Sequence, residues 1–412
     1  MILARPRRSL LLRTTLLCVV ACVPLMLHAQ PEQPGNPVKK KIIAWGGLDW
    51  YSPENVQTNI RKFEELPFDG MVLQGFKAKT VGKDVMFDWL CFGKERFERR
   101  QLAETIQTLK SIKFKRFTDN LLRYNVTPGD VDWFADFDTI LHNARLWAAA
   151  ARETGMKGWL FDVEDYQGRV FDYKKMKFTG KKSFAEYAQQ ARLRGREFMK
   201  AVQEPFPDIV VFLALAHSYV NRAPQAINRL SELEYGLLPA FLNGMIEAAG
   251  PKVRIIDGHE QSYGYLTAED YYRGYHATRQ KALALVPANV HARYNARMEV
   301  AMALYVNYLF ASPGAARGPT AFLTAKERLR LFEHNVYHAL SVTDEYVWCY
   351  SERLCWWEKG HAVPTPDGAL DALREARRKY DSNQPLGFDM TERIAAARAA
   401  EKKAHDPGKR KS

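Results

Sequence analysis

Short apolar runs alternate with amphipathic stretches along most of the chain, from about residue 41 to residue 357. The apolar runs are rich in β-branched and aromatic residues, and the stretches between them repeat apolar positions three and four residues apart. The first pattern predicts buried strands, and the second predicts helices that bury one face. We expect strands at 42–46, 70–74, 117–125, 158–164, 209–216, 253–257, 298–306 and 346–350.

Helical periodicity fills the intervals between these strands, and proline and glycine mark the junctions, as at Pro67, Gly155 and Pro207. The predicted helices are 55–66, 100–111, 139–154, 184–203, 232–249, 267–285 and 324–340. Eight strands that alternate with helices indicate an α/β fold of the (β/α)8 TIM-barrel type. An open doubly wound sheet is the alternative, but no glycine-rich phosphate loop opens a helix after a strand.

The barrel pattern is bordered by three other segments. Residues 1–29 are predicted to be a signal peptide, 30–40 a linker, 41–360 the barrel, and 361–412 a helical extension with a basic tail. Within the extension we expect two short helices, at 368–380 and 391–403.

The first segment has the composition of an export signal. Four arginines precede residue 14, and an almost uncharged apolar run covers residues 14–27, which is short for a membrane span. We expect cleavage after Ala29, which gives an exported protein, periplasmic or extracellular, that begins at Gln30. The stretch that ends in Ala21-Cys22 also resembles a lipobox, so the alternative is a lipoprotein anchored to the membrane at Cys22.

The composition indicates a globular protein and argues against several other classes. The 412 residues are 47% hydrophobic and 26% charged, which is typical of globular proteins. The net charge of +13 is unevenly placed, with four of the charges in the N-terminal segment and three in the C-terminal tail. No basic stripe or zinc spacing indicates a nucleic-acid partner. Three cysteines remain after residue 29, namely Cys91, Cys349 and Cys355, which is neither a disulfide framework nor a zinc motif. We expect no cofactor.

A barrel enzyme places its chemistry at the carboxyl ends of its strands and in the loops that follow. In this chain those positions are rich in carboxylates, amides and aromatic rings. Aromatic faces stack on pyranose rings, and carboxylates and amides bind hydroxyl groups, so the pattern favours a carbohydrate partner. The expected substrate-binding residues are Trp45, Asp49, Trp50, Asn125, Tyr166, His217, Tyr263, Asn307, Tyr350 and Trp356.

The strongest local signal is the run Gly158-Trp-Leu-Phe-Asp-Val-Glu-Asp-Tyr166. Side chains alternate along a strand, so Trp159, Phe161 and Val163 should face the helices, whereas Asp162 and Glu164 should face the barrel interior. Two acidic residues on an inward face are costly to bury unless they are paired, hydrogen-bonded or functional. We expect Glu164 to be catalytic and Asp162 to orient it or to bind a sugar hydroxyl.

The run Phe-Asp-Val-Glu164, after a helix that ends in Thr154-Gly155-Met156-Lys157, resembles the (β/α)8-barrel glycoside hydrolase superfamily. Many families of that superfamily place a catalytic carboxylate at this point. The resemblance covers residues 41–357 and selects no numbered family. It implies a glycosidase, but the seventh strand, where the commonest plan has its nucleophile, ends in Tyr305-Val306-Asn307.

Hydrolysis of a glycosidic bond requires two carboxyl groups, one protonated and one ionised. With Glu164 as general acid, Glu352 is the preferred partner because Trp348, Tyr350 and Glu352 share one strand face. Glu260 is the second choice. Two other functions stay open: a metal-dependent isomerase or lyase that uses Asp162, Glu164, His259 and Glu260, and a carbohydrate-binding barrel without catalysis.

Overall fold

The computed structural model describes residues 38–47, 51–310, 318–352, 354–356 and 363–405. Asp49 and Trp50, both expected to bind substrate, lie outside the described residues. The chain divides into two compact units after Val38, and the helices and strands described below belong to the second, Lys39–Ser412. No helix in the described ranges is long and apolar enough to cross a membrane.

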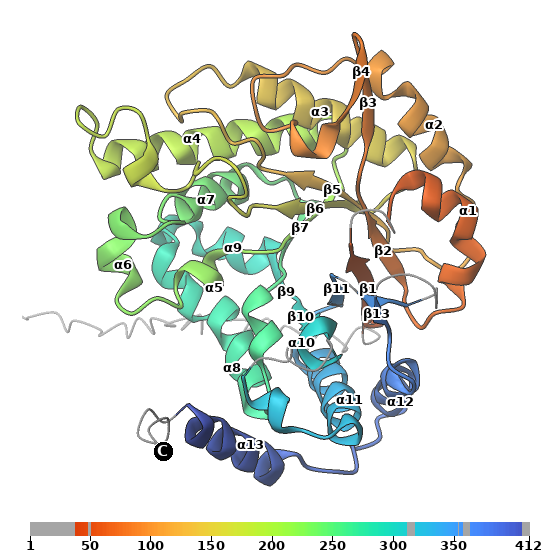
Figure 1. The fold of residues 1–412 in the computed structure, drawn as a ribbon. Coiled ribbons are helices and arrows are strands. Elements are labelled where there is room, and N and C mark those ends of the chain that lie inside the picture. The colour runs from red at the N-terminus through yellow and green to blue at the C-terminus, as the bar shows by residue number, and fades with distance from the viewer. Residues whose placement is uncertain (1–37, 48–50, 311–317, 353, 357–362, 406–412) are drawn as a thin grey trace, which may run out of the picture. The chain divides into compact units, whose positions relative to one another are not determined.

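A parallel sheet that closes on itself forms the centre of this unit (Figure 1). Its order is β10-β11-β1-β2-β5-β6-β7-β8-β9, and the two outer segments are halves of one strand interrupted at Ala301. One half pairs with β8 and the other with β11, so the eight predicted strands close into the expected barrel. The bounds are β1 Lys41–Gly46, β2 Gly70–Leu73, β5 Leu121–Asn125, β6 Gly158–Asp162, β7 Val210–Leu213, β8 Arg254–Asp257, β9 Met298–Val300, β10 Met302–Tyr305 and β11 Tyr346–Ser351.

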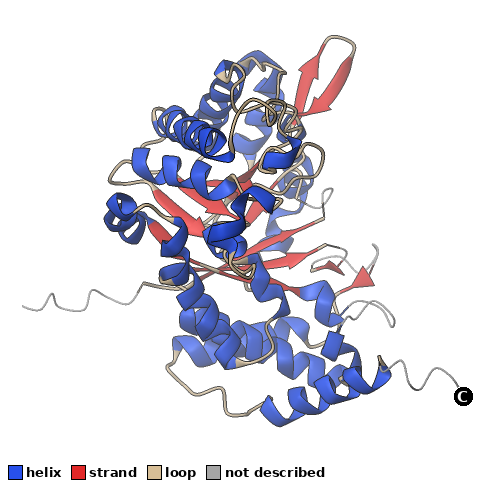
Figure 2. Cartoon of the chain, turned by 90° about the vertical axis from the view of Figure 1, so that its left-hand side faces the viewer, coloured by secondary structure: helices blue, strands red, loops and turns tan. Residues whose placement is uncertain are grey.

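Helices surround the sheet, as Figure 2 shows. Their N-termini follow the sequence signals: Ser183, Thr267 and Thr324 each form a capping box with the acidic residue three positions later. The long helices are α1 Pro53–Glu64, α2 Ala103–Ser111, α3 Asp138–Glu153, α4 Phe184–Gln203, α7 Leu238–Ala248, α8 Ala268–Arg279 and α11 Ala325–Val342. The short ones are α5 His217–Val220, α6 Ala226–Arg229, α9 His291–Arg297 and α10 Val306–Phe310.

Two predicted helices are shorter than expected. The helix predicted from residue 232 begins at Leu238, with Pro239 in its first turn, where the missing N–H costs least. The helix predicted to residue 285 ends at Arg279, and a 3-10 turn, Lys281–Leu285, follows. The hairpin of β3 Lys77–Thr80 and β4 Lys83–Met86, which projects from the barrel in Figure 1, was not predicted because its strands are mostly exposed and polar.

Side-chain alternation divides the apolar residues between two layers. Trp159, Phe161 and Val163 pack in the large outer core between sheet and helices, whereas Leu160 belongs to a smaller core inside the barrel. This is the predicted alternation along β6. The interior core is filled by bulky residues, including Ile43, Trp45, Phe212 and Trp348, so the barrel is packed rather than hollow.

The C-terminal extension contains α12 Ala369–Asp381 and α13 Thr391–Ala404, close to the predicted bounds. Arg377 of α12 forms an ion pair with Asp69, at 2.7 Å, and Asp69 also accepts a hydrogen bond from the Ile42 amide. The extension is therefore tied to the N-terminal ends of β1 and β2, opposite the end at which a barrel carries its site.

Candidate active site

A buried ion pair lies at the carboxyl ends of β5 and β6. Arg123 donates through Nε (3.2 Å) and Nη2 (2.6 Å) to Oδ2 of Asp162, and their side chains are only 4% and 0% exposed. The guanidinium also lies over the rings of Trp89, Tyr166 and Trp45, at 4.7, 5.7 and 5.8 Å from the ring centroids. Asp162 therefore has a buried cationic partner that the sequence pattern did not identify.

Glu164 follows Asp162 in the loop after β6. Its amide donates to Oδ1 of Asp162 at 3.2 Å, and the Tyr166 hydroxyl donates to Oε2 of Glu164. Burial and the neighbouring Asp162 charge raise the pKa of Glu164 to about 7, while the Tyr166 hydrogen bond and Arg123 oppose the rise. This carboxyl is thus poised to change charge near neutral pH.

Glu260 lies in the turn after β8, at the start of the 3-10 helix Glu260–Gly264. Its Oε2 is buried and has no hydrogen-bond partner among the residues that the structure describes. Burial raises the pKa of Glu260 to about 8, and the charges of Glu164 and Asp162 act in the same direction, whereas Arg222 opposes them. The charge of Glu164 therefore acts on Glu260, and Glu260 retains its proton near neutral pH.

Glu352 differs from the other two glutamates in its surroundings. It is exposed just beyond β11 and accepts a 2.7 Å hydrogen bond from the Tyr305 hydroxyl. It lines a cleft of about 380 Å³ at the barrel mouth, together with Trp45, Gly46, Gly47, Gln74, Trp89, Arg123, Tyr166 and Tyr350. Aromatic rings, one amide and one guanidinium form most of this wall, which is the chemistry of a sugar-binding groove.

Four of the expected binding residues gather around this mouth. Trp45 and Tyr350 are in ring contact at 4.9 Å, and Tyr263 stacks on Tyr350 at 6.2 Å and contacts Tyr305 at 4.9 Å. The fourth, Tyr166, is 47% exposed and bridges the cleft to Glu164. The strand-end pattern therefore located a real cluster.

Other expected binding residues lie outside this cleft. His217 is fully buried and bonds Asn243 of α7 at 3.0 Å, and Trp356 packs between Phe68 and Phe332 in the outer core. Asn125 is also fully buried, and its Oδ1 accepts the Thr127 amide in the loop after β5. Asn307 is buried on α10. None of these four residues is among those that line the cleft.

Sequence reasoning did not select Trp89, Gln74 or Arg123. Trp89 lies in the 3-10 turn η1, Phe87–Trp89, which directly follows the β3–β4 hairpin. The sequence did not predict this hairpin, so it gave no reason to place Trp89 at the mouth. Gln74 connects two parts of the wall, accepting from Trp45 Nε1 at 2.9 Å and donating to the Gly46 carbonyl at 2.6 Å. Arg123 had a usable signal, because a cation at an inward position of β5 requires an acidic partner on the next strand.

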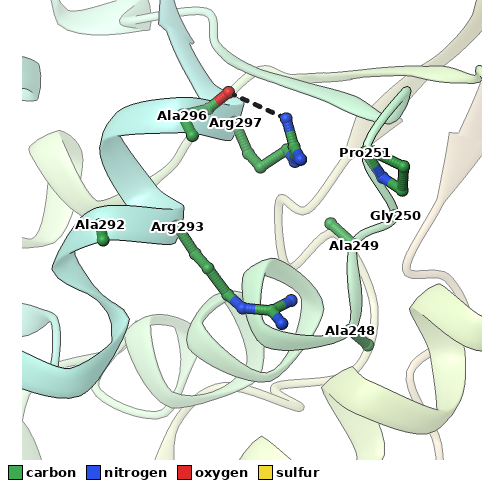
Figure 3. A pocket seen from close by; sticks show the side chains of 8 residues that line it. All are labelled: Ala248, Ala249, Gly250, Pro251, Ala292, Arg293, Ala296 and Arg297. Carbon is green, nitrogen blue, oxygen red and sulfur yellow. Dashed lines mark hydrogen bonds between the residues drawn. The ribbon is translucent and has the colours of Figure 1, made fainter.

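Two other features of the described residues bear on alternative sites. Among the described residues, no three His, Cys, Asp or Glu side chains are grouped so that they could hold a metal ion. A hollow of about 530 Å³ between the end of α7 and α9 is lined by small residues with Arg293 and Arg297 and contains no carboxylate (Figure 3). Its lining residues come directly before β8 and β9, so the hollow lies at the N-terminal ends of these strands, away from Glu164 and Glu260.

No family model matches the chain, and no curated protein does. Solved structures with a similar fold include glycoside hydrolases. A Bacteroidetes-affiliated GH5 cellulase is 9% identical and covers 88% of this chain and 96% of its own, with a TM-score of 0.44. A GH5 enzyme of Streptomyces cattleya, in complex with Manb1-4GlcNAc, is 10% identical over 86% and 84%, with a TM-score of 0.44. A type I 3-dehydroquinate dehydratase of Clostridium difficile is 9% identical over 84% and 94%, with a TM-score of 0.33. These likenesses concern the barrel and do not select an activity.

Proposed function

We propose that this protein is a glycoside hydrolase that cleaves its substrate with the carboxyl groups of Glu164 and Glu260. The observation that carries the proposal is the pair itself: two half-buried carboxyls that follow different strands. Burial raises the pKa of both, and the charge of Glu164 raises the pKa of Glu260 further. Glycosidic cleavage needs one protonated and one ionised carboxyl group at the same pH. A pair that shares a proton near neutral pH meets that requirement.

The hydrogen bonds support one assignment of the two roles. Glu164 accepts the Tyr166 hydroxyl, which stabilises its ionised form, whereas Oε2 of Glu260 has no donor among the described residues. Glu260 thus keeps the proton and donates it to the leaving oxygen, and ionised Glu164 acts as nucleophile or as base for water. This reverses the role expected for Glu164 from the sequence and replaces Glu352 as its partner.

The cleft lined by Trp45, Trp89, Tyr166 and Tyr350 supplies the sugar-binding surface. Aromatic faces exclude water from a pyranose ring, and Gln74 and Glu352 provide acceptors for hydroxyl groups. Glu352 is therefore a binding residue at the rim in this proposal.

The test is hydrolysis of a panel of chromogenic glycosides and polysaccharides by the wild-type protein and by three variants. Glu164→Gln and Glu260→Gln should each lower turnover at least about a hundredfold. Glu260→Gln should recover much of the rate on 2,4-dinitrophenyl glycosides, whose leaving group needs no proton, and Glu164→Gln should not. Glu352→Gln is the matched control and should mainly raise KM. Near wild-type turnover in Glu164→Gln would refute the proposal, as would loss of activity in Glu352→Gln alone.

Export belongs to the same proposal, because a polysaccharide substrate is met outside the cytoplasm. We infer cleavage after Ala29 from the charged and apolar pattern of residues 1–29. Mass spectrometry of the protein from its native cells should give Gln30 as the first residue. A lipid-modified Cys22 would instead establish a membrane-anchored form.

A further inference from the structure

The turn that presents Glu260 has an uncommon backbone. His259 has a φ of +49° and a ψ of +54°, in the left-handed region that non-glycine residues rarely adopt. Within the described ranges, the other non-glycine residues with positive φ are Gln225 and Asn383, both exposed, whereas His259 is only 1% exposed. A buried left-handed residue persists only when its surroundings hold it there.

Main-chain and side-chain hydrogen bonds hold this turn from several elements. The His259 amide donates to Oδ1 of Asp257 at 3.0 Å, and the Ser262 hydroxyl donates to the His259 carbonyl at 2.8 Å. Gly258 is fixed on both sides: its amide donates to the Leu213 carbonyl of β7, and its carbonyl accepts Nε1 of Trp348 of β11, both at 2.7 Å. The main chain next to Glu260 therefore has little freedom.

The His259 imidazole contacts two hydroxyl groups, one on α5 and one at the end of the turn. Nδ1 lies 3.1 Å from the Ser218 hydroxyl of α5, and Nε2 lies 2.6 Å from the Tyr265 hydroxyl. One neutral tautomer satisfies both contacts: Tyr265 donates to Nε2, Nδ1–H donates to Ser218, and Ser218 donates to Asp257. Burial lowers the pKa of His259 to about 3, which keeps the ring neutral in ordinary buffers.

Helix α8 is shaped to accommodate this contact. Gly274 faces the imidazole, and a Cβ at this position would lie 2.8 Å from Nε2 of His259 and 2.8 Å from Cε2 of Tyr265. Because real Cβ contacts essentially never fall below 3.0 Å, any larger residue would push the two rings. A glycine inside a helix is less favourable than an alanine, so the close approach at Gly274 reduces the stability of α8 itself.

We propose that His259 is a positioning residue for Glu260: by bridging Ser218 and Tyr265 it holds the left-handed turn, and the turn holds the Glu260 carboxyl beside Glu164. His259 acts through the turn, with its own ring nitrogens engaged by Ser218 and Tyr265. The effect of His259 on catalysis rests on the proposed function, whereas its effect on the position of Glu260 does not.

The consequence concerns the groups that face Glu260, which are Glu164, Asp162, Arg222, Tyr219 and Tyr263. If the turn loosens, Glu260 gains water and moves away from the two acidic side chains. Both changes lower its pKa toward that of an ordinary glutamate, so the carboxyl loses its proton at neutral pH.

The experiment removes one hydrogen bond of the bridge with Tyr265→Phe and uses Tyr272→Phe as the matched control. Tyr272 is on the exposed side of α8, with 61% of its surface accessible. The glutamate carboxyls of the full chain are labelled with ¹³C and titrated by NMR, and the Glu260 signal is assigned by its loss in Glu260→Gln. In Tyr265→Phe the Glu260 midpoint should fall by at least about one pH unit, and in Tyr272→Phe it should not move.

Kinetics give the second readout. In Tyr265→Phe, kcat should fall about 10- to 100-fold with little change in KM, and the basic limb of the pH profile should shift to lower pH. Gly274→Ala should act in the same direction without removing any hydrogen-bonding group, and it keeps the test open if Tyr265→Phe fails to fold. An unchanged Glu260 midpoint in both Tyr265→Phe and Gly274→Ala would overturn the inference, even in an active glycosidase. A shifted midpoint in a protein that cleaves no glycoside would support the positioning role and refute the proposed function.

Discussion

Arg123 and Asp162 form an ion pair inside the barrel, with Nη2 of the arginine 2.6 Å from Oδ2 of the aspartate. Both side chains are almost completely removed from water, and a second carboxylate, that of Asp88, adds to the field around the guanidinium. Arg123 forms part of the cleft wall, and Asp162 accepts from the Glu164 amide. The Tyr166 hydroxyl, which donates to Glu164, also lies 3.3 Å from Oδ2 of Asp162. The ion pair thus contacts both the cleft wall and the loop that contains Glu164.

Removing one partner of this ion pair should lower the free energy of unfolding. Asp162→Asn leaves a buried cation without its nearest counter-charge, and we expect the free energy of unfolding to fall by about 3 kcal/mol, the lower end of the usual range because Asp88 remains. Urea denaturation at pH 7 measures the change. Lys182→Gln, which breaks the exposed ion pair with Glu186, is the control and should have little effect. A loss below about 1 kcal/mol for Asp162→Asn would contradict the burial of an essential pair.

The paired carboxyls predict a narrow pH profile. Protonation of Glu164 below about pH 7 removes the base, and ionisation of Glu260 above about pH 8 removes the acid. The kcat/KM of the free enzyme should therefore be highest between these two values and fall on both sides. Glu352→Gln should leave both limbs where they are. A profile that stays flat from pH 5 to pH 9 would be incompatible with the pair.

The same groups should reduce stability at high pH. Their pKa values are raised in the folded protein, so the folded state binds more protons than the unfolded state between about pH 4.5 and pH 8, and stability falls as pH rises through this window. Glu260→Gln removes one such group. It should stabilise the protein by roughly 2–4 kcal/mol at pH 9 and have little effect at pH 4, as measured by urea unfolding. Glu95→Gln, at an exposed position, is the control and should show no such pH dependence.

Substitution of Trp89 tests sugar binding in the cleft separately from the catalytic step. Its ring faces Arg123 and contacts Tyr166 at 5.3 Å, so it contributes to the wall without touching Glu260 in any described contact. Trp89→Ala should weaken sugar binding by about 0.5–1.5 kcal/mol and raise KM accordingly, with kcat largely retained. Trp89→Phe should restore part of the affinity, and Tyr272→Ala, on the exposed face of α8, should leave it unchanged. Isothermal titration with an oligosaccharide found in the panel gives the affinities.

The sequence by itself determined the barrel. Period-two and helical periodicities are local properties, so they place each strand within a few residues, and alternation along β6 correctly assigns Trp159 and Phe161 to the outer layer and Asp162 to the interior. It also directed attention to the strand ends, where Trp45, Tyr166, Tyr263 and Tyr350 come together. These features depend on the immediate neighbours of each residue along the chain.

Which carboxyls meet was decided only by the tertiary structure. Strand parity favoured Glu352 because parity shows which face of a strand a side chain occupies. Parity contains no information on the distance between residues in two different loops. The left-handed turn at His259 presents Glu260, whose pKa the charge of Glu164 raises, and the His259 ring contacts Ser218, Tyr265 and Gly274, of which Ser218 is 41 residues away along the chain. Arg123 likewise became part of the site through Asp162, on the neighbouring strand. Burial, hydrogen bonding and charge proximity, which together set the pKa of a carboxyl, are properties of the packed fold.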